Sequence, residues 1–436
     1  MTSLIDQLRS NGIVGAGGAG FPAYKKFQAR VDTVIVNAAE CEPLVHKDKE
    51  LLKAFGKQVV EGLRLVCEQV GASQGVIGIK EKYDGVIAEM ETLLEPGMRL
   101  HPLGDYYPAG DEFILVYEVT RQVIPPGGLP LEVGVVVSNV ETLINVAVGR
   151  PVTHKYLTIA GAVDKPCTVQ VPVGMSLSDT LRLSGVTLPS DFWVLTGGVM
   201  MGVLPKSLDE PVTRTTGAII VLPNDHQVLT RYRRPQVEID RIGRSACDQC
   251  SFCTELCPRF LIGHPIEPHR AMRSLGFAID KTPQVLGTLY CCECNLCTMI
   301  ACPEDLDPKN VCTDNKRRLN ATQTKWPGDR MSRTKPNAMF EGRRTPVTRL
   351  IKKLNLRKFE NVGPMTDLRG EPDSVRIPTK MHIGAPADPC VQAGAKVAVG
   401  DVIARIGGEA LGVDIHASIG GTVEKVSESE IVIRRN

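Results

Sequence analysis

Apolar and polar positions follow two different periods over the first 150 residues. Short apolar runs predict buried strands at Val31–Val36, Gln74–Ile79 and Val133–Val137. Apolar residues at helical spacing predict helices over 47–70, 83–94 and 141–148. Alternation of strands and helices is typical of an α/β fold. We therefore expect a first α/β domain over residues 1–150.

The pattern changes to shorter strands separated by Gly and Pro turns after residue 150. Strands are predicted at 157–160, 168–171, 192–195 and 218–221, with a helix over 177–183. This pattern favours a small α+β domain of ubiquitin-like size over residues 151–235. A cysteine-rich module with short helices between ligand loops is expected over 236–320.

The last third begins with a strongly basic stretch. Residues 316–358 hold 14 Lys and Arg against Asp329 and Glu341, with several prolines, which is typical of an exposed linker. We place this linker at 321–375. Within it Val347, Leu350, Ile351 and Leu354 have helical spacing. They predict a short helix that docks on the protein itself or, as the less favoured alternative, on an acidic partner.

Residues 376–436 contain short strands and Gly turns, the pattern of a small β-sandwich or barrel. The whole chain is therefore predicted to be a multidomain α/β and α+β protein.

Composition narrows the possible functions. The 436 residues carry a formal net charge of only +2, which argues against nucleic acid as the main partner. The N-terminal residues lack a signal-peptide pattern, and no apolar run is long enough to span a membrane. We expect a cytoplasmic protein, in which 14 cysteines indicate metal binding rather than disulfides.

Two cysteine runs carry the strongest signal. The first is Cys247, Cys250, Cys253 and Cys257 followed by proline; the second is Cys291, Cys294, Cys297 and Cys302, also followed by proline. In ferredoxin-type runs three thiolates hold one [4Fe–4S] cluster and the fourth reaches the other cluster. The second run departs slightly, with four residues before its last cysteine.

The crossover rule assigns one cluster to Cys247, Cys250, Cys253 and Cys302, and the other to Cys291, Cys294, Cys297 and Cys257. Structural zinc sites are the less favoured alternative, because zinc sites usually show two separated pairs. Cys292 and Cys312 lack the spacing of the runs and are interpreted as bystanders.

A glycine-rich loop spans Gly15 to Gly20 and ends in Phe21 and Pro22. Glycines let backbone N–H groups approach a phosphate. A dinucleotide fingerprint needs a strand before the loop and a helix after it. Here a helix is predicted before the loop and Pro22 follows it, so a Rossmann site is disfavoured.

The glycine loop, the segment Asn37–Pro43 and the segment Asn139–Leu143 together resemble the flavin-binding subunit of respiratory complex I and, more closely, the C subunit of the Rnf electron-transport complex. The resemblance implies FMN, with NADH beside it. Gly15, Gly17, Gly18 and Gly20 would line the phosphate side and Lys26 would contact the flavin. Asn37, Glu40, Asn139 and Thr142 would hold the ring and ribityl chain, and Glu42 would lie near the nicotinamide as the catalytic candidate.

Two further details belong to the same resemblance. Ala39 stands where the complex I pattern has an acidic residue, so that contact is absent. The pair Asp111 and Glu112 after Gly110 resembles another element of the flavin loop.

The resemblance extends to most of the chain. Residues 156–222 look like the soluble-ligand-binding β-grasp domain of Rnf C subunits, and the two-cluster module follows in the same order. Rnf C subunits carry a barrel-sandwich domain of the lipoyl type at the N-terminus, whereas here it lies at the C-terminus. Its predicted hairpin tip, 407–410, lacks the lysine that carries a lipoyl group.

This domain order is similar to the family of cobalamin reductases of propanediol-utilisation microcompartments. That family implies transfer of electrons from NADH through FMN and two [4Fe–4S] clusters to cobalamin, an adenosyltransferase and shell or enzyme components as partners, and a location inside a microcompartment. The alternatives are an Rnf-type subunit that reduces a protein partner and a flavin-free ferredoxin-like carrier. His226, His264 and His269 are weak candidates for cobalt ligands, with a structural role favoured for each.

Overall fold

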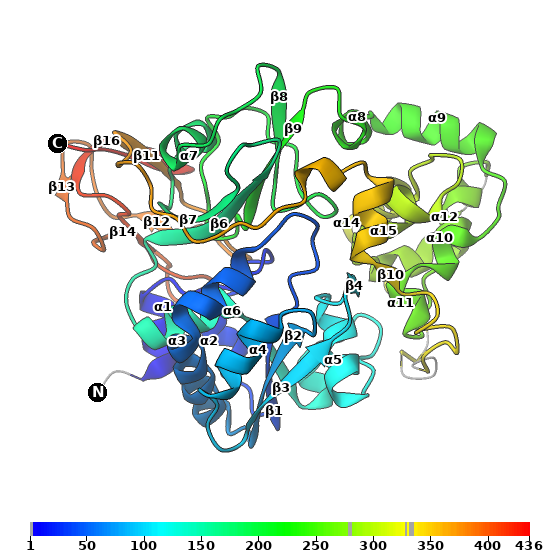
Figure 1. The fold of residues 1–436 in the computed structure, drawn as a ribbon, viewed down its shortest axis with the longest axis horizontal. Helices are drawn as coiled ribbons and strands as arrows, with labels where there is room; N and C mark the ends of the chain where they lie inside the picture. The colour runs from blue at the N-terminus through cyan, green and yellow to red at the C-terminus, as the bar shows by residue number, and fades with distance from the viewer. Residues whose placement is uncertain (1–2, 278–280, 328, 331–334) are drawn as a thin grey trace.

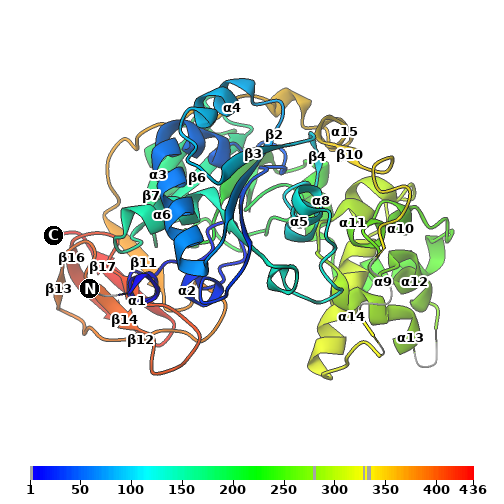
Figure 2. The same cartoon turned by 90° about the horizontal axis from the view of Figure 1, so that it is seen from below.

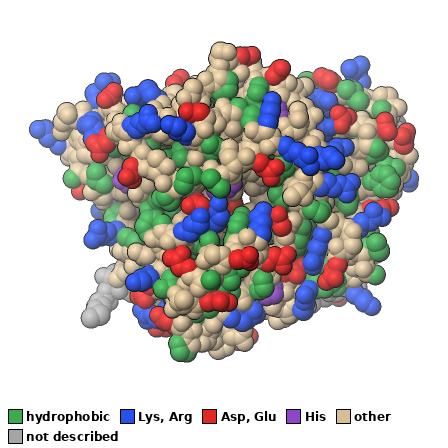
Figure 3. Space-filling view, in the orientation of Figure 1, with side chains coloured by type: hydrophobic (Ala, Val, Ile, Leu, Met, Phe, Trp, Pro, Cys, Tyr) green, Lys and Arg blue, Asp and Glu red, His purple; other side chains and the backbone are tan. Residues whose placement is uncertain are grey.

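The computed structural model describes residues 3–277, 281–327, 329–330 and 335–436. In Figure 1 an α/β unit lies below a second sheet, with the C-terminal strands at one end and the cysteine-bearing helices at the other. The view from below keeps these two ends apart (Figure 2). Charges of both signs are interspersed over the face in Figure 3. Throughout the described ranges, every helix is too short or too polar to cross a membrane.

The α/β unit is built around a parallel sheet with the strand order β3-β2-β1-β5. Its elements are α1 (Leu4–Ser10), α2 (Ala23–Lys26), β1 (Thr33–Ala38), α3 (Lys47–Val70), β2 (Gln74–Lys80), α4 (Asp84–Glu91), β3 (Met98–Leu103), β4 (Tyr106–Tyr107), α5 (Glu112–Thr120), η1 (Pro130–Val133), β5 (Val135–Asn139) and α6 (Val140–Val148). Strand β1 has β2 on one side and β5 on the other, so the strand order reverses there. In open parallel sheets, ligands bind at the carboxyl ends of the strands beside such a reversal.

Helices α3 and α6 pack closely against each other. A Cβ atom on Gly62 of α3 would lie only 2.2 Å from the carbonyl oxygen of Leu143 in α6. Glycine therefore permits this approach. Val59, Leu63 and Leu143 are fully buried at the contact and belong to the main core of the unit.

The second sheet has the β-grasp topology that the resemblance implies. It contains β6 (His154–Gly161), β7 (Cys167–Pro172), α7 (Leu177–Ser184), β8 (Phe192–Thr196) and β9 (Ala218–Pro223). Its order is β7-β6-β9-β8, with a parallel central pair and antiparallel outer strands. Leu177 and Leu181 of α7 are buried in its core.

The cysteine-bearing region consists of short helices, as expected. They are α8 (Gln227–Arg233), α9 (Gln236–Ala246), α10 (Phe252–Glu255), α11 (Pro258–Leu261), α12 (Pro268–Ser274), α13 (Thr282–Val285), the 3₁₀-helix η2 (Leu286–Tyr290), the π-helical turn η3 (Cys297–Ala301) and α14 (Pro308–Ala321). Pro258 occupies the first turn of α11 directly after Cys257. A proline is well tolerated there, because the N–H of that position has no partner within a helix.

The basic stretch is not simply an exposed linker, which corrects the prediction for part of it. Residues 316–321 belong to α14, and β10 (Thr345–Pro346) pairs with β4. Helix α15 (Val347–Lys353) buries Val347, Leu350, Ile351 and the following Leu354 in a shared core. The prediction that this helix docks on the protein itself is confirmed. The 3₁₀-helix η5 (Arg357–Phe359) follows it.

The C-terminal strands form two small sheets that fit a barrel-sandwich fold. They are β11 (Ser374–Pro378), β12 (Asp388–Pro389), β13 (Lys396–Val397), β14 (Val402–Arg405), β15 (Ile415–His416), β16 (Gly421–Val426) and β17 (Glu430–Arg434). Their core is continuous with that of the β-grasp sheet, since Ile377 and Ile433 join Leu157 and Val221 in one buried cluster. The Arg9 side chain of α1 also donates a 2.5 Å hydrogen bond to the carbonyl oxygen of Gly408.

Candidate functional site

The carboxyl ends of β1 and β5 bring two flavin candidates together. Asn37 and Asn139 are paired residues of these neighbouring parallel strands. The glycine loop lies against the same place, because the backbone N–H of Ala16 donates to Thr142 Oγ1 at 3.0 Å. A Cβ atom on Gly17 would lie 3.3 Å from Asn139 Cβ. Three segments far apart in sequence thus meet at the carboxyl ends of β1 and β5, a place called the crevice below.

The glycines of the loop differ in what surrounds them. Gly18 has φ +116°, and a Cβ atom built on it would meet nothing within 4 Å. Gly20 has φ +67° and faces the Thr215 side chain, 2.8 Å from the Cβ position. Gly18 therefore fits a cradle that leaves space for a ligand, whereas Gly17 packs against the Asn139 side chain and Gly20 against the β-grasp unit.

A buried network of charged side chains lies behind the crevice. Lys47 Nζ contacts Asp48 and lies 3.2 Å from Glu141 Oε2, and Lys155 from β6 pairs with the same Glu141. Asn139 Nδ2 donates to Asp48 Oδ2 at 2.8 Å. Burial lowers the pKa of Lys155 to about 8, although Glu141 opposes that shift. This network fixes the side chain of Asn139.

Glu40 joins the same network through the backbone. Its Oε2 accepts a 2.9 Å hydrogen bond from the N–H of Asp48. Burial, together with the nearby Asp48 carboxylate, raises the pKa of Glu40 to about 7. Glu40 also has φ +26°, an uncommon conformation for a residue with a side chain and a sign of local constraint.

Lys26 and Asn37 are also held by contacts near the crevice. Lys26 Nζ donates to the carbonyl oxygen of Val137 at 2.8 Å and lies 3.3 Å from Glu112. Asn37 Nδ2 donates to the carbonyl oxygen of Gly110 at 2.8 Å. The loop at Gly110 that the resemblance singled out is therefore attached to the crevice.

Glu42 faces the β-grasp unit. Its Oε2 and Oε1 accept hydrogen bonds from the backbone N–H groups of Met200 and Met201, at 2.9 Å and 2.8 Å. Burial raises the pKa of Glu42 to about 7 against the effect of these hydrogen bonds. Its predicted place near a nicotinamide stays a prediction.

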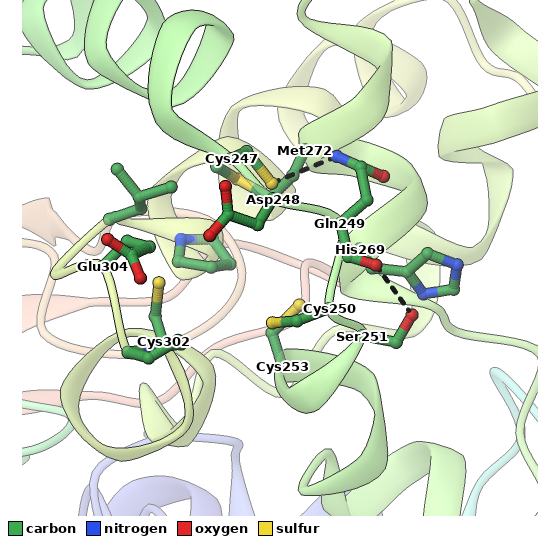
Figure 4. A pocket seen from close by; sticks show the side chains of 13 residues that line it. Cys247, Asp248, Gln249, Cys250, Ser251, Cys253, His269, Met272, Cys302 and Glu304 are labelled. Atoms are coloured by element: carbon green, nitrogen blue, oxygen red, sulfur yellow. Dashed lines mark hydrogen bonds between the residues drawn. The ribbon is translucent and has the colours of Figure 1, made fainter.

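Four cysteines line one hollow in the helical region. They are Cys247, Cys250, Cys253 and Cys302, and their sulfur atoms are drawn around a common space in Figure 4. The side-chain amide of Gln249 donates to the sulfur of Cys247 at 3.1 Å. Cys302 of the second run thus lines the same hollow as the triplet of the first run, the arrangement that the crossover rule predicts for one cluster.

The other four predicted ligands also lie near one another. Cys292, burial and the charges of Cys257 and Cys297 raise the pKa of Cys294, and burial, followed by Cys292 and Cys291, raises the pKa of Cys257. Burial raises the pKa of Cys253 in the first group to about 12. Burial disfavours the charged thiolate. A metal ion such as iron offsets this effect, because it binds the thiolate and stabilises its charge.

The cysteines interpreted as bystanders lie close to the second group. Cys292 forms a side-chain hydrogen bond with Cys294 that holds the Cys292 pKa near 7, and Cys312 is fully buried within range of Cys297. Among the described residues, His, Cys, Asp and Glu do not converge tightly enough in any group of three to hold a single metal ion.

The three candidate histidines make local structural contacts. His226 Nδ1 accepts a hydrogen bond from the N–H of Val228 at the start of α8. His264 Nε2 contacts the carbonyl oxygen of Ile124 at 2.9 Å, and His269 Nδ1 contacts Thr254 Oγ1 at 2.8 Å. These contacts fit the structural role that the sequence favours.

Sequence reasoning missed the buried charges Lys47, Asp48, Glu141 and Lys155. The signal available was the run Lys47–Glu50, in which four charged residues open an otherwise amphipathic helix. In the structure all four residues of this run are buried.

Comparison with protein families assigns three of the regions. Residues 8–148 match the Nuo51 FMN-binding domain, residues 246–307 match a 4Fe-4S dicluster domain, and residues 357–435 match the RnfC barrel sandwich hybrid domain.

Relatives with assigned names match over different lengths. The chain is 41% identical over 435 residues to cobalamin reductase PduS of Citrobacter freundii and, again at 41%, to that of Salmonella typhimurium, covering 99% of this chain and 96% of each relative. It is 32% identical to the C subunit of the Na(+)-translocating ferredoxin:NAD(+) oxidoreductase complex of Acetobacterium woodii, over 57% of this chain and 56% of that protein. A solved NAD+-reducing [NiFe]-hydrogenase is similar with a TM-score of 0.49 and 19% identity, over 75% of this chain and 63% of the other.

An FMN-binding domain and a 4Fe-4S dicluster domain in one chain define a flavin and iron–sulfur oxidoreductase. The domain composition and the similarity over the full length identify the family within this class. The chain belongs to the PduS cobalamin reductase family.

Proposed function

We propose that this protein transfers electrons from NADH through FMN and two [4Fe–4S] clusters to cob(III)alamin and cob(II)alamin, regenerating cob(I)alamin for propanediol degradation. The observation that carries the proposal is the similarity to named cobalamin reductases over 99% of the chain. FMN exchanges two electrons with NADH and single electrons with other centres, and each cluster carries one electron at a time.

In this proposal the crevice between β1 and β5 holds FMN. The open space beside Gly18 supports a phosphate held by backbone N–H groups of the loop. Asn37, Asn139 and Thr142 supply hydrogen-bonding groups for the ring and ribityl chain. Glu40 and Lys26 add ionisable groups to the same proposed site.

The cysteines hold two clusters in the crossed arrangement. The hollow lined by Cys247, Cys250, Cys253 and Cys302 supports the first cluster. The mutual electrostatic influence of Cys257, Cys294 and Cys297, together with Cys291, supports the second. The thiolates would supply all four ligands of each cluster.

The cellular setting follows from the same family. We propose a cytoplasmic protein inside a bacterial microcompartment, acting with an adenosyltransferase and with shell or enzyme components. Cobalamin reduction delivers the cobalt state that an adenosyltransferase consumes, so proximity of the two proteins has a chemical reason.

Anaerobic assay of the purified, reconstituted chain tests the function. NADH should reduce hydroxocobalamin in wild type, and Cys250→Ala and Cys294→Ala should lose this reaction while retaining FMN. Reduction of a small dye should survive in both variants, because a dye can collect electrons at the flavin. Normal cobalamin reduction by both variants would contradict the proposed path.

An Rnf-type electron-transport protein is the second candidate. The 32% identity to the C subunit of an Na(+)-translocating ferredoxin:NAD(+) oxidoreductase complex favours it, but over only 57% of the chain. NADH-driven dye reduction with no cobalamin reduction would support this candidate. Absence of flavin from the purified chain would instead support a ferredoxin-like carrier.

A further inference from the structure

The loop between β8 and β9 lies between the flavin crevice and the second cysteine run. Its residues 197–202 read Gly-Gly-Val-Met-Met-Gly. On one side the loop donates two backbone hydrogen bonds to the carboxylate of Glu42, from Met200 and Met201. Glu42 follows β1 by only four residues, so this contact attaches the loop to the segment that carries Asn37 and Glu40.

Gly198 makes this contact sterically possible. A Cβ atom on Gly198 would lie 2.6 Å from Glu42 Cδ and Oε2, and Gly198 has φ +156°. A side chain here would displace the carboxylate. The loop is therefore shaped to receive Glu42.

On its other side the same loop contacts the second cysteine run. The carbonyl oxygen of Met200 accepts a 3.1 Å hydrogen bond from Asn295 Nδ2 and a 3.0 Å hydrogen bond from the Tyr232 hydroxyl. Asn295 directly follows Cys294 and has φ +68°, a conformation that asparagine tolerates better than most residues. Met200 thus joins Glu42 and Asn295 through its own N–H and C=O groups.

A second contact fixes the neighbouring residue of the run. The hydroxyl of Tyr107, from the α/β unit, donates to the carbonyl oxygen of Cys294 at 2.8 Å. Tyr107 is 2% exposed and Met200 is fully buried. These hydrogen bonds lie out of water, where losing a partner leaves a buried polar group unsatisfied.

The hollow of the first cluster is lined by its own region. In the part of the chain that the structure describes, all 13 residues that line it lie from Cys247 to Pro308. Cys302 packs in a small hydrophobic core whose described members begin at Ile239, and Cys291 packs against the edge of that core. Cys294 instead shares its core with Leu44, Tyr107 and Met200.

We infer that Glu42, Met200 and Asn295 form a hydrogen-bonded bridge that positions the second cysteine run next to the flavin crevice. The run containing Cys291, Cys294 and Cys297 is then the flavin-proximal cluster site, and the hollow at Cys250 is the distal one. Glu42 and Asn295 are positioning residues. The inference rests on the proposed function for the electron path, whereas the bridge itself rests on the contacts above.

The bridge is tested in the full-length chain loaded with FMN and iron–sulfur clusters. Asn295→Gly removes the amide donor without straining a residue of positive φ, and Glu42→Gln replaces one carboxylate oxygen by a donor. Asn355→Gly is the matched control, since Asn355 has φ +57° and is exposed outside the bridge. FMN and iron content are measured first in each protein.

Hydrogen exchange at the amides of residues 199–201 reports the bridge without any turnover. Loss of one buried hydrogen bond should speed exchange there by about five- to tenfold in Asn295→Gly and in Glu42→Gln. Asn355→Gly should match wild type. Exchange equal to this control in both bridge variants would overturn the bridge.

Freeze-quench EPR after mixing with NADH tests the proximal assignment. A Cys294→Ser protein identifies the signal of the second-run cluster by its altered spectrum. In wild type that signal should develop first, and Asn295→Gly should slow it severalfold while direct reduction by dithionite stays unchanged. Earlier reduction of the first-run cluster would overturn the assignment. Failure of NADH to reduce either cluster would refute the proposed function, while the exchange data would still decide the bridge.

Discussion

Lys155 Nζ donates a 3.0 Å hydrogen bond to the carbonyl oxygen of Ala16, 139 residues earlier in the chain. The same ammonium pairs with the buried Glu141, whose Oε1 also accepts from the N–H of Tyr156. The first strand of the β-grasp sheet therefore holds the glycine loop against the start of α6.

Replacing Lys155 by Met should lower the free energy of unfolding by about 3–5 kcal/mol, because Glu141 would stay buried with only Lys47 to compensate its charge. FMN affinity should fall as well, since Ala16 loses one of its two hydrogen bonds. Urea denaturation and flavin fluorescence titration measure the two effects. Lys165→Met, at an exposed position, is the control, and equal behaviour of the two variants would contradict this role.

Gly18→Val should abolish FMN retention. The substitution strains a residue at φ +116° and fills the open space beside the loop. Gly394→Val shares a positive φ of +88° and open surroundings but lies in the C-terminal unit, so it controls for backbone strain alone. Flavin content after gel filtration is the measurement, and full retention in Gly18→Val would make the loop merely structural.

Cys302→Ala should damage the cluster of the first triplet, and Cys257→Ala should damage the other. The reason is that Cys302 lines the hollow formed by Cys247, Cys250 and Cys253. Wild type should contain about eight iron atoms per chain if both cubanes are complete. Iron analysis and EPR of each variant measure this outcome. If each variant instead lost the cluster held by the other three cysteines of its own run, the crossed assignment would be reversed. Zinc in place of iron would refute the assignment of iron–sulfur clusters.

Glu42 should make stability depend on pH. Burial raises its pKa from 4.5 to about 7, so between these values the folded chain keeps a proton that the unfolded chain has released. Stability therefore falls as pH rises through this window and is level above it. Relative to Glu42→Gln, wild type should lose about 1–3 kcal/mol between pH 4.5 and pH 7.

Urea denaturation of both proteins at several pH values measures that difference. Glu91→Gln, at an exposed position, should show no comparable window. A pH-independent difference between wild type and Glu42→Gln would show that the Glu42 carboxyl has no raised pKa.

Hydrophobic periodicity predicted the long helices and central strands well. Helix α3 has the predicted bounds at both ends, because its apolar stripe packs on α6 and the sheet. Strand β3 was not predicted. It lies at the edge of the sheet and only Leu103 is buried, so its sequence lacks a strong apolar run.

The sequence pattern also failed to predict the last residues of β1 and β5. Prediction ended them at Val36 and Val137, but β1 continues through Ala38 and β5 through Asn139. Parallel pairing supplies backbone partners there, so polar side chains can occupy strand positions at the crevice. The flavin candidates themselves came from the resemblance, which periodicity could not have provided.

Hydrogen bonds made by backbone atoms of distant segments cannot be predicted from sequence patterns. The resemblance makes Glu42 a catalytic candidate near the nicotinamide, yet its partners are the backbone N–H groups of Met200 and Met201, far later in the chain. Burial of Lys47 and Glu141 likewise depends on mutual compensation of charge in the folded chain. Such partners are set by the tertiary fold.

The contact between Arg9 and Gly408 places the barrel-sandwich unit against α1, at the other end of the chain. In the Rnf C pattern the barrel-sandwich unit precedes the flavin unit, whereas here it follows the cysteine region. Because the unit rests against α1, its place in space can be reached from either end of the polypeptide. A rearrangement of coding segments would then preserve the architecture and change only the order of synthesis. On the ribosome, the flavin unit of this protein emerges before the barrel-sandwich unit that packs against α1.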